Sequence, residues 1–230
     1  MDNRFQREKL LIGEDGFNKL QNSKVIVYGV GGVGSFVVEG LARSGVGYLI
    51  LVDPDNYDIT NINRQLGALS STIGKSKVEV LKERALDINP EIKVEAYRPS
   101  EIEGGETSLI DSSVSYVVDC IDTMANKFAI IEKCNNENVR IISATGAANK
   151  LDATAFEVSD IFKTSVCPVC KLLRNELRKR NIKHLKVVYS KEEPIKFDRE
   201  EGKKVLGSMS YVPSTCGLII AGEVIKDLIK

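Results

Sequence analysis

The sequence has no apolar run long enough to cross a membrane, and its first residues are charged. We therefore expect neither a membrane anchor nor a signal peptide. Net charge is also absent, because 32 Lys and Arg residues balance 32 Asp and Glu residues. A neutral chain has no overall attraction to nucleic acid, although this does not exclude a local basic patch.

Cysteine and histidine are scarce, with five cysteines and one histidine in 230 residues. An odd number of cysteines argues against a disulfide framework, so we expect a reducing, cytoplasmic environment. His184 has no partner motif, which argues against a role as a general base. The 43% of hydrophobic and 28% of charged residues indicate a globular chain with an ample core.

The most informative stretch reads GVGGVG and spans residues 29–34. An apolar run at 25–28 predicts a strand before it, and helical spacing of apolar residues predicts a helix at 36–43 after it. A glycine turn between strand and helix is typical of phosphate-binding loops, because the backbone and the first helical N–H groups can approach a phosphate. The glycines of this loop are Gly29, Gly31, Gly32 and Gly34.

A second predicted strand, at 48–52, ends at Asp53. An acidic residue about twenty positions after such a loop is placed to bind a ribose hydroxyl. On these residues alone, an NAD site and an ATP site remain equally open.

Predicted strands and helices alternate through the rest of the chain, which indicates an α/β fold with a doubly wound, mostly parallel sheet. We expect residues 1–150 to form a nucleotide-binding core that includes an N-terminal helical segment. Residues 151–230 are expected to be a C-terminal extension that completes the same domain on the substrate side. The expected elements are one or two short helices at 4–20, helices at 74–88, 125–136 and 215–229, a weak helix at 101–110, a basic helix at 167–183, strands at 93–97, 116–120, 140–144, 155–158 and 185–189, a polar loop at 53–71 and a mobile loop at 190–207.

The carboxyl ends of parallel strands face one crevice, where this order places Arg64, Lys77 and Asp122 near the glycine loop. Hydride transfer has no use for two cations near phosphates. Attack on a nucleoside triphosphate does, because the leaving pyrophosphate builds negative charge. A carboxylate there can hold the accompanying magnesium ion. Each cation alone could be a solvated surface residue, but the whole set favours ATP.

These residues resemble the motifs of the ubiquitin-activating-like adenylyltransferases, which include the enzymes that adenylate sulfur-carrier proteins for molybdopterin and thiamine synthesis. The resemblance implies a Rossmann-like adenylation fold and a homodimer in which Arg7 reaches into the partner's site. It implies that Asp53 binds ribose and that Asp122 holds magnesium. The matching residues are 4–7, 29–34, Asp53, 61–65, Lys77 and 119–122. The implied ATP contacts are Gly29, Gly31, Gly32, Gly34, Asp53, Asn61, Asn63, Arg64, Lys77 and Asp122. The implied catalytic residues are Arg7, Arg64, Lys77 and Asp122.

The C-terminal third is similar to one branch, the tRNA threonylcarbamoyladenosine dehydratases, at residues 172–180, 186–194 and 207–214. The branch implies that ATP adenylates the threonyl carboxylate of the modified adenosine. The carbonyl oxygen of the neighbouring carbamoyl group then closes a ring, and AMP leaves. Because nucleophile and electrophile belong to one substrate, ring closure needs no protein nucleophile.

Three other functions remain open. The first is adenylation of the C-terminal glycine of a ubiquitin-like sulfur-carrier protein, with such a carrier or a sulfur-transfer protein as partner. The second is an NAD-dependent dehydrogenase. The third is a scaffold that binds nucleotide and a partner protein without catalysis.

Cys167 and Cys170 form a C-x-x-C motif, which in the sulfur-carrier enzymes is joined by a second such pair to complete a zinc site. No second pair follows here, so we expect no zinc and two reduced thiols. Cys120 and Cys134 are predicted core residues, and Cys216 is the candidate for thiol chemistry.

The basic helix is either a solvated face or, as the resemblance suggests, a surface that contacts tRNA phosphates. Its predicted tRNA-binding residues are Lys171, Arg174, Arg178, Lys179 and Arg180.

Overall fold

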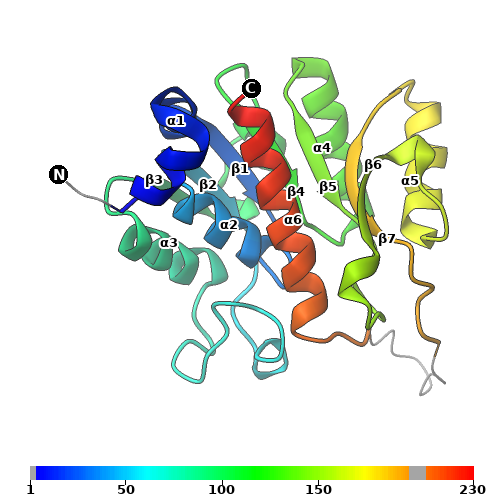
Figure 1. The fold of residues 1–230 in the computed structure, drawn as a ribbon. Helices are drawn as coiled ribbons and strands as arrows, with labels where there is room; N and C mark the ends of the chain where they lie inside the picture. Colours follow the sequence, from blue (N-terminus) through cyan, green and yellow to red (C-terminus); the bar gives the residue numbers. More distant parts are fainter. Residues whose placement is uncertain (1–3, 197–205) are drawn as a thin grey trace.

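One seven-stranded sheet, in the order β3-β2-β1-β4-β5-β7-β6, runs through the molecule (Figure 1). The computed structural model describes residues 4–196 and 206–230. All neighbouring strands are parallel except β6, which is antiparallel to β7. The mostly parallel sheet is therefore confirmed. The strands are β1 (Lys24–Tyr28), β2 (Tyr48–Val52), β3 (Lys93–Tyr97), β4 (Tyr116–Asp119), β5 (Ile141–Ala144), β6 (Phe156–Asp160) and β7 (Lys186–Ser190).

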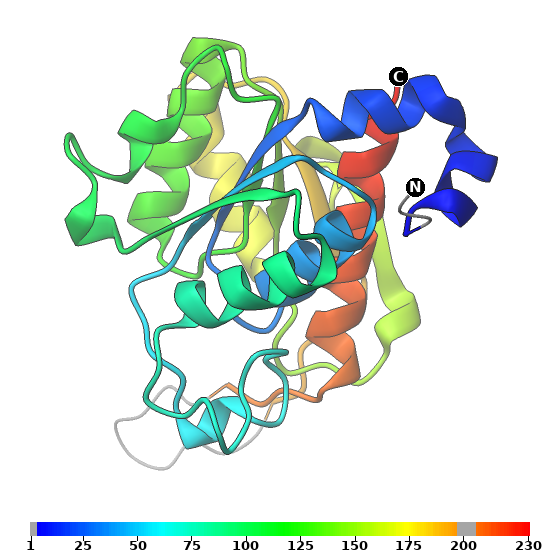
Figure 2. The ribbon, with the colours of Figure 1, turned by 90° about the vertical axis from the view of Figure 1, so that its left-hand side faces the viewer.

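Helices cover both faces of this sheet (Figure 2). Helices α2, α3 and α6 lie on one face, with α1 beside α6, whereas α4 and α5 lie on the other. Among the described residues, no helix has the length and hydrophobicity needed to span a membrane. The helices are α1 (Gln6–Gln21), α2 (Gly34–Arg43), α3 (Lys77–Ile88), α4 (Met124–Glu137), α5 (Pro168–Lys179) and α6 (Tyr211–Leu228).

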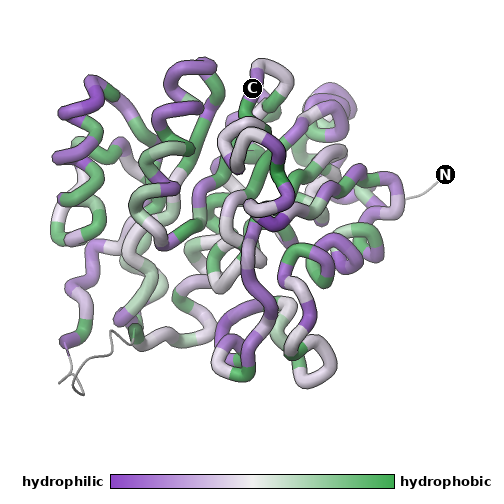
Figure 3. The backbone as a smooth tube through the Cα atoms, turned by 180° about the vertical axis from the view of Figure 1, so that it is seen from behind, coloured by the Kyte–Doolittle hydropathy of each residue, from purple (hydrophilic) through white to green (hydrophobic). Residues whose placement is uncertain are grey.

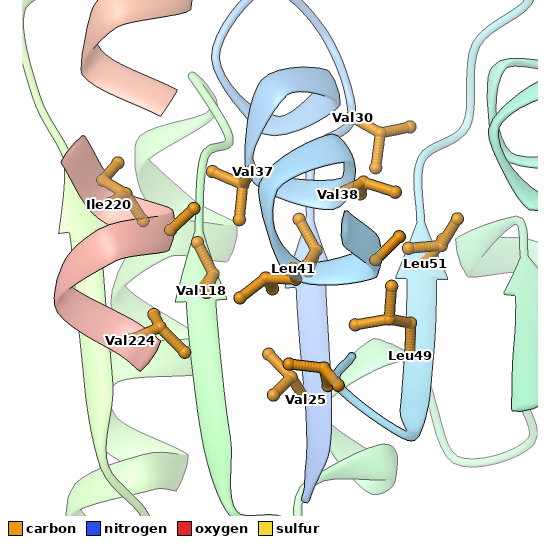
Figure 4. Close-up of a cluster of buried hydrophobic side chains, with 14 of the residues drawn as sticks. Val25, Val30, Val37, Val38, Leu41, Leu49, Leu51, Val118, Ile220 and Val224 are labelled. Atoms are coloured by element: carbon orange, nitrogen blue, oxygen red, sulfur yellow. The ribbon is translucent and has the colours of Figure 1, made fainter. Parts of the chain in front are cut away.

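The alternation of side chains along β1 explains the two layers of core. Val25 and Val27 face α2 and α6, whereas Ile26 and Tyr28 belong to the cluster under α4. Because successive strand residues point to opposite faces, a strand that is apolar at every position must be covered on both sides. Figure 4 shows the α2–α6 side, where Ile220 and residues of α2 meet the strands.

Glycine and asparagine set several boundaries that the apolar pattern alone does not. The weak helix expected at 101–110 is wrong. Two short 3₁₀ turns, Pro99–Glu101 and Glu106–Leu109, are separated by Gly104 and Gly105 with φ of 80° and 81°. The basic helix α5 ends at Lys179 instead of 183, because Asn181 adopts a left-handed φ of 56°.

Other boundaries differ by a few residues. Helix α6 begins at Tyr211, since Pro213 lies in the first turn, where its missing N–H is not needed. Helix α1 is interrupted at Gly13, so the segment expected to form one or two short helices forms two. Most of the loop expected at 190–207 lies outside the described residues, because these omit 197–205.

Candidate functional site

The glycine loop between β1 and α2 lies where three strands end. The Gly29 N–H donates to the Val52 carbonyl at 2.8 Å, and a Cβ on Gly29 would lie 2.8 Å from the Cys120 carbonyl oxygen. Gly29 has a φ of 79°, and a Cβ on Gly34 would lie only 1.8 Å from the Gly29 oxygen. The loop therefore requires glycine at both positions, and it directs the open N–H groups of the first turn of α2 toward this edge.

Asp53 braces this loop from the end of β2. Its carboxylate accepts from the Val30 N–H at 2.8 Å and from the Asp55 N–H at 2.9 Å. Burial raises the pKa of Asp53, and the nearby Lys77 opposes the rise. The sequence predicts that Asp53 lies at this edge, but its hydrogen bonds to the loop were not predicted. The available signal was the position of a carboxylate directly after a strand. Ribose binding by Asp53 stays a prediction.

Lys77 is the first residue of α3 and is almost fully buried beside two carboxylates. Its ammonium lies 2.7 Å from Asp55 and 3.9 Å from Asp53. The expected cation is thus next to the glycine loop, but it is ion-paired. Asp55, which the sequence did not single out, has a side chain that is 62% exposed, so an anionic ligand can compete with it for Lys77.

The loop after β2 folds on itself and presents Arg64 to the glycines. Asp58 begins the short 3₁₀ helix Ile59–Asn61, and the Asn61 side chain accepts from the Asp58 N–H at 3.0 Å. Asn61 therefore helps to build this loop. Whether it also contacts ATP stays a prediction.

Arg64 extends from this loop to Gly32. The Arg64 Cγ lies 3.4 Å from the position that a Gly32 Cβ would occupy. Its guanidinium donates to the Thr60 carbonyl and to Asn63 Oδ1, both at 2.9 Å. Both acceptors are neutral, so these contacts orient the positive charge without cancelling it. A neighbouring side chain, Gln65, lies close to Gly31.

The C-terminal extension also reaches this edge. Asn63 donates through Nδ2 to the Ser208 carbonyl at 2.9 Å, and Pro213 lies 3.4 Å from the Cβ position of Gly32. In Figure 1 the loop after β2 and the start of α6 meet at the lower edge of the sheet. The sequence indicated an extension on the substrate side but not these contacts, because they join distant segments.

Asp122 is exposed on the turn between β4 and α4. It follows Cys120 by two residues, and the Cys120 carbonyl contacts Gly29. The turn is held by a buried ion pair of 2.6 Å between Asp119 of β4 and Lys127 of α4. Asp119 lies within the 119–122 motif, but its pairing with Lys127 was not predicted from the sequence.

An exposed carboxylate at Asp122 fits the oxygen-ligand preference of magnesium, which commonly uses one or two protein carboxylates together with phosphates. Within residues 4–196 and 206–230, no group of three or more His, Cys, Asp or Glu residues could hold a metal by itself. The geometry therefore suits a metal that arrives with its nucleotide.

Arg7 lies away from the glycine loop of its own chain. It is exposed near the start of α1, and its neighbour Glu8 hydrogen-bonds to Ser44, which follows the far end of α2. Arg64, Lys77 and Asp122 thus all adjoin the glycine loop, and Arg7 does not.

A hollow of about 610 Å³ opens at the opposite edge of the sheet, where Ser23, Ser115 and Arg140 precede their strands. None of the predicted site residues lines it. The convergence of polar groups, and not the shape of the surface, identifies the candidate site.

A model of the ThiF family matches residues 5–230, which is nearly the whole chain. The chain belongs to the ThiF family.

Several relatives of this ThiF-family chain are named tRNA threonylcarbamoyladenosine dehydratases. A tRNA threonylcarbamoyladenosine dehydratase of Bacillus subtilis (strain 168) is 44% identical over 245 residues, which cover 100% of this chain and 96% of the relative. The E. coli tRNA N6-threonylcarbamoyladenosine dehydratase in complex with ATP superimposes with a TM-score of 0.87 at 30% identity, covering 98% of this chain and 93% of that one. Its complex with AMP gives a TM-score of 0.86. The predicted adenylation fold and family resemblance are confirmed.

The cysteines of this ThiF-family chain differ in their surroundings. Cys134 is buried in the core as expected, and Cys120 is partly buried. Cys216 is fully buried, and burial raises its pKa to about 12. Burial therefore argues against thiol chemistry at Cys216, because it disfavours the thiolate that such chemistry needs.

The basic helix α5 is amphipathic, as the alternation of hydrophilic and hydrophobic residues at the left of Figure 3 shows. Arg174 is half-buried and donates to the Thr164 carbonyl at 3.1 Å, so its contacts are internal. Arg180 pairs with Glu132 at 2.5 Å and with Glu176 at 3.3 Å. The three other predicted tRNA-binding residues, Lys171, Arg178 and Lys179, are exposed.

Proposed function

We propose that this protein is a tRNA threonylcarbamoyladenosine dehydratase that uses ATP to cyclise the threonylcarbamoyl group of an adenosine in tRNA. The observation that carries the proposal is the meeting of Arg64 with the braced glycine loop. A cation with an uncancelled charge at this position suits a triphosphate. The likeness to dehydratases over the full chain supports the choice of acceptor.

In this proposal the triphosphate of ATP lies along the glycine loop and the first turn of α2. Arg64 stabilises the charge that develops on the leaving pyrophosphate, and Lys77 turns from Asp55 to the phosphates. Asp53 accepts hydrogen bonds from the ribose. Asp122 would hold the magnesium ion that accompanies ATP and that neutralises phosphate charge when bound.

The threonyl carboxylate attacks the α-phosphate, so an acyl-adenylate forms and pyrophosphate leaves. The carbamoyl oxygen then attacks the acyl carbon, and AMP leaves with the electron pair of the broken bond. The net change in the tRNA is the loss of one water. The chain's contribution is to orient the reacting groups, which brings the high effective molarity of ring closure into use.

The tRNA is proposed to lie against the exposed basic residues of α5, which can pair with its phosphates. A homodimer would supply Arg7 to the partner's site, since Arg7 does not face its own. The reaction is proposed to occur in the cytoplasm, where tRNA and ATP are available.

The test is to incubate the full chain with ATP, magnesium and tRNA that contains threonylcarbamoyladenosine, and to analyse the nucleosides by mass spectrometry. We expect a product lighter by one water, which requires ATP and is not formed with AMP. Pyrophosphate exchange that depends on a ubiquitin-like carrier protein would instead support the sulfur-carrier activity. Stabilisation by NAD but not by ATP would rule out both.

A further inference from the structure

Two thiols meet at the start of α5, at some distance in sequence from the nucleotide residues. Cys167 is the residue that precedes the helix, and Cys170 is its third residue. Cys167 has an extended backbone (φ −67°, ψ 120°), so the C-x-x-C motif places it just before the first helical turn, which contains Cys170. Cys170 donates a hydrogen bond to the Cys167 sulfur, and both cysteines are free thiols.

The surroundings of Cys167 favour a negative charge. The N–H groups of Val169 and Cys170 point to its sulfur, as expected at a helix start. The buried ammonium of Lys150 is also close, and it donates to the Glu192 carbonyl. The Glu192 carboxylate accepts from the N–H groups of residues 151 and 152 and makes no direct ion pair with Lys150, although its charge still acts on that ammonium.

The two thiols respond oppositely to this arrangement. The hydrogen bond from Cys170, helped by the helix N–H groups and by Lys150, lowers the pKa of Cys167. The same hydrogen bond and burial raise the pKa of Cys170. Cys134 and Cys216, which are not at a helix start, have pKa values raised by burial to about 12. The arrangement therefore favours ionisation of Cys167 over ionisation of Cys170.

The turn before the helix covers the pair. Cys167 is only 3% exposed, whereas Val166 and Pro168 on either side of it are exposed, so a small disulfide reaches the sulfur only if this turn moves. Thr145 Oγ1 lies 3.2 Å from the Cys170 sulfur on the inner side. In the described part of the chain, no third ligand is positioned with this pair to hold a metal.

We propose that Cys167 and Cys170 form a redox-active dithiol site, which a low-molecular-weight disulfide such as oxidised glutathione converts reversibly into an internal disulfide. The Cys167 thiolate attacks one sulfur of the small disulfide, whose S–S bond breaks and releases one thiolate. Cys170 then loses its proton and attacks the Cys167 sulfur, which releases the second thiolate. Two electrons pass to the small disulfide; the Cys170 proton ends on one of the released thiolates, and the other takes a proton from water. This site does not depend on the proposed function.

The test uses the full chain, reduced and then equilibrated with mixtures of reduced and oxidised glutathione. After acid quenching, remaining thiols are alkylated and mapped by mass spectrometry. We expect two of the five thiols to become protected, with a link between Cys167 and Cys170 that a reductant reverses. A chain that keeps all five thiols free in every mixture would overturn the proposal.

Variants assign the roles within the pair. Cys170→Ser should retain one glutathione on Cys167, because the thiol that displaces it is gone, whereas Cys167→Ser should take up none near neutral pH. Absence of the adduct in Cys170→Ser would contradict the assignment.

If that variant does not fold, brief alkylation of the unmodified chain at several pH values shows which cysteine reacts first. Because the pKa of Cys167 is lowered whereas burial raises those of Cys134 and Cys216, Cys167 should react first. Faster labelling of any other cysteine would refute the site.

Discussion

At the scale of single residues, the candidate site rests on how Arg64 is oriented. Two neutral acceptors orient its guanidinium without cancelling its charge, and its Cγ lies beside Gly32. Fixed cations of this kind stabilise charge that develops in a transition state because they need no reorganisation.

We expect Arg64→Ala to reduce kcat for dehydration by roughly 10²–10³-fold, the range measured when one charge-stabilising group is removed. The matched control is Arg43→Ala at the far end of α2, where an exposed pair with Glu39 is lost. The control should retain activity, and both variants should keep their thermal stability. Full dehydratase activity in Arg64→Ala would refute the assignment of this residue.

The glycines of the loop, Asp53 and Asp122 were predictable from the sequence, because each closely follows a predicted strand and this is a local pattern. Their partners were not. Lys77 is recognisable as a cation, but its pairing with Asp55 depends on how α3 returns to the loop after β2. Arg174 appears on the sequence as one of five basic residues, and only the fold shows that it binds Thr164 internally.

At the scale of elements, the turn from β1 into α2 permits no side chain at Gly34. We expect Gly34→Ala to abolish stabilisation by ATP, because the new Cβ would overlap the Gly29 oxygen at 1.8 Å and displace the loop. Gly222→Ala on α6 is the control, since nothing lies within 4 Å of its added Cβ. It should retain ATP binding and gain about 0.4–1 kcal/mol in unfolding free energy. The unfolding temperature of each variant is measured with and without ATP. An equal increase with ATP in both variants would contradict the prediction.

The junction of β4 and α4 depends on a buried ion pair. Lys127→Met should lower the free energy of unfolding by about 3–5 kcal/mol, because it leaves the buried Asp119 carboxylate without a partner. Lys133→Met, on the same helix but in a partly exposed pair with Glu137, should change it by less than about 1 kcal/mol. Denaturant titration compares them, and similar losses in both variants would show that the buried pair has no special role.

The outer face of α5 is where tRNA binding is expected. The double change Lys171→Glu and Lys179→Glu should weaken tRNA binding and reduce the salt dependence of the affinity by about two phosphate contacts. The control is Lys226→Glu on α6, which also replaces an exposed positive charge by a negative one. If both proteins bind tRNA equally at several salt concentrations, α5 is a solvated face.

The order of elements was largely predictable because buried parallel strands are apolar at every position and the helices between them are amphipathic. The 3₁₀ turns at 99–109 were not, since Gly104 and Gly105 interrupt a sequence that is otherwise compatible with a helix. Helix ends depend on single residues such as Asn181, whose conformation is set by the chain that follows it.

At the scale of the whole molecule, the position of Arg7 is the feature that the single chain leaves unexplained. If Arg7 completes the partner's site, Arg7→Ala and Arg64→Ala should each be inactive alone. Mixed and allowed to exchange subunits, they should regain about a quarter of the sites, because each mixed dimer then has one intact site. No recovery, in a mixture shown by mass to contain mixed dimers, would place Arg7 outside the reaction.

The helix that closes the fold, α6, touches the glycine loop: Pro213 lies beside Gly32, and a Cβ on Gly217 would lie 2.3 Å from the Val33 oxygen. Synthesis proceeds from the N-terminus, so a growing chain on the ribosome has its glycine loop long before it has this neighbour. The contacts of Pro213 and Gly217 with this loop can therefore form only after residues 211–228 have left the exit tunnel.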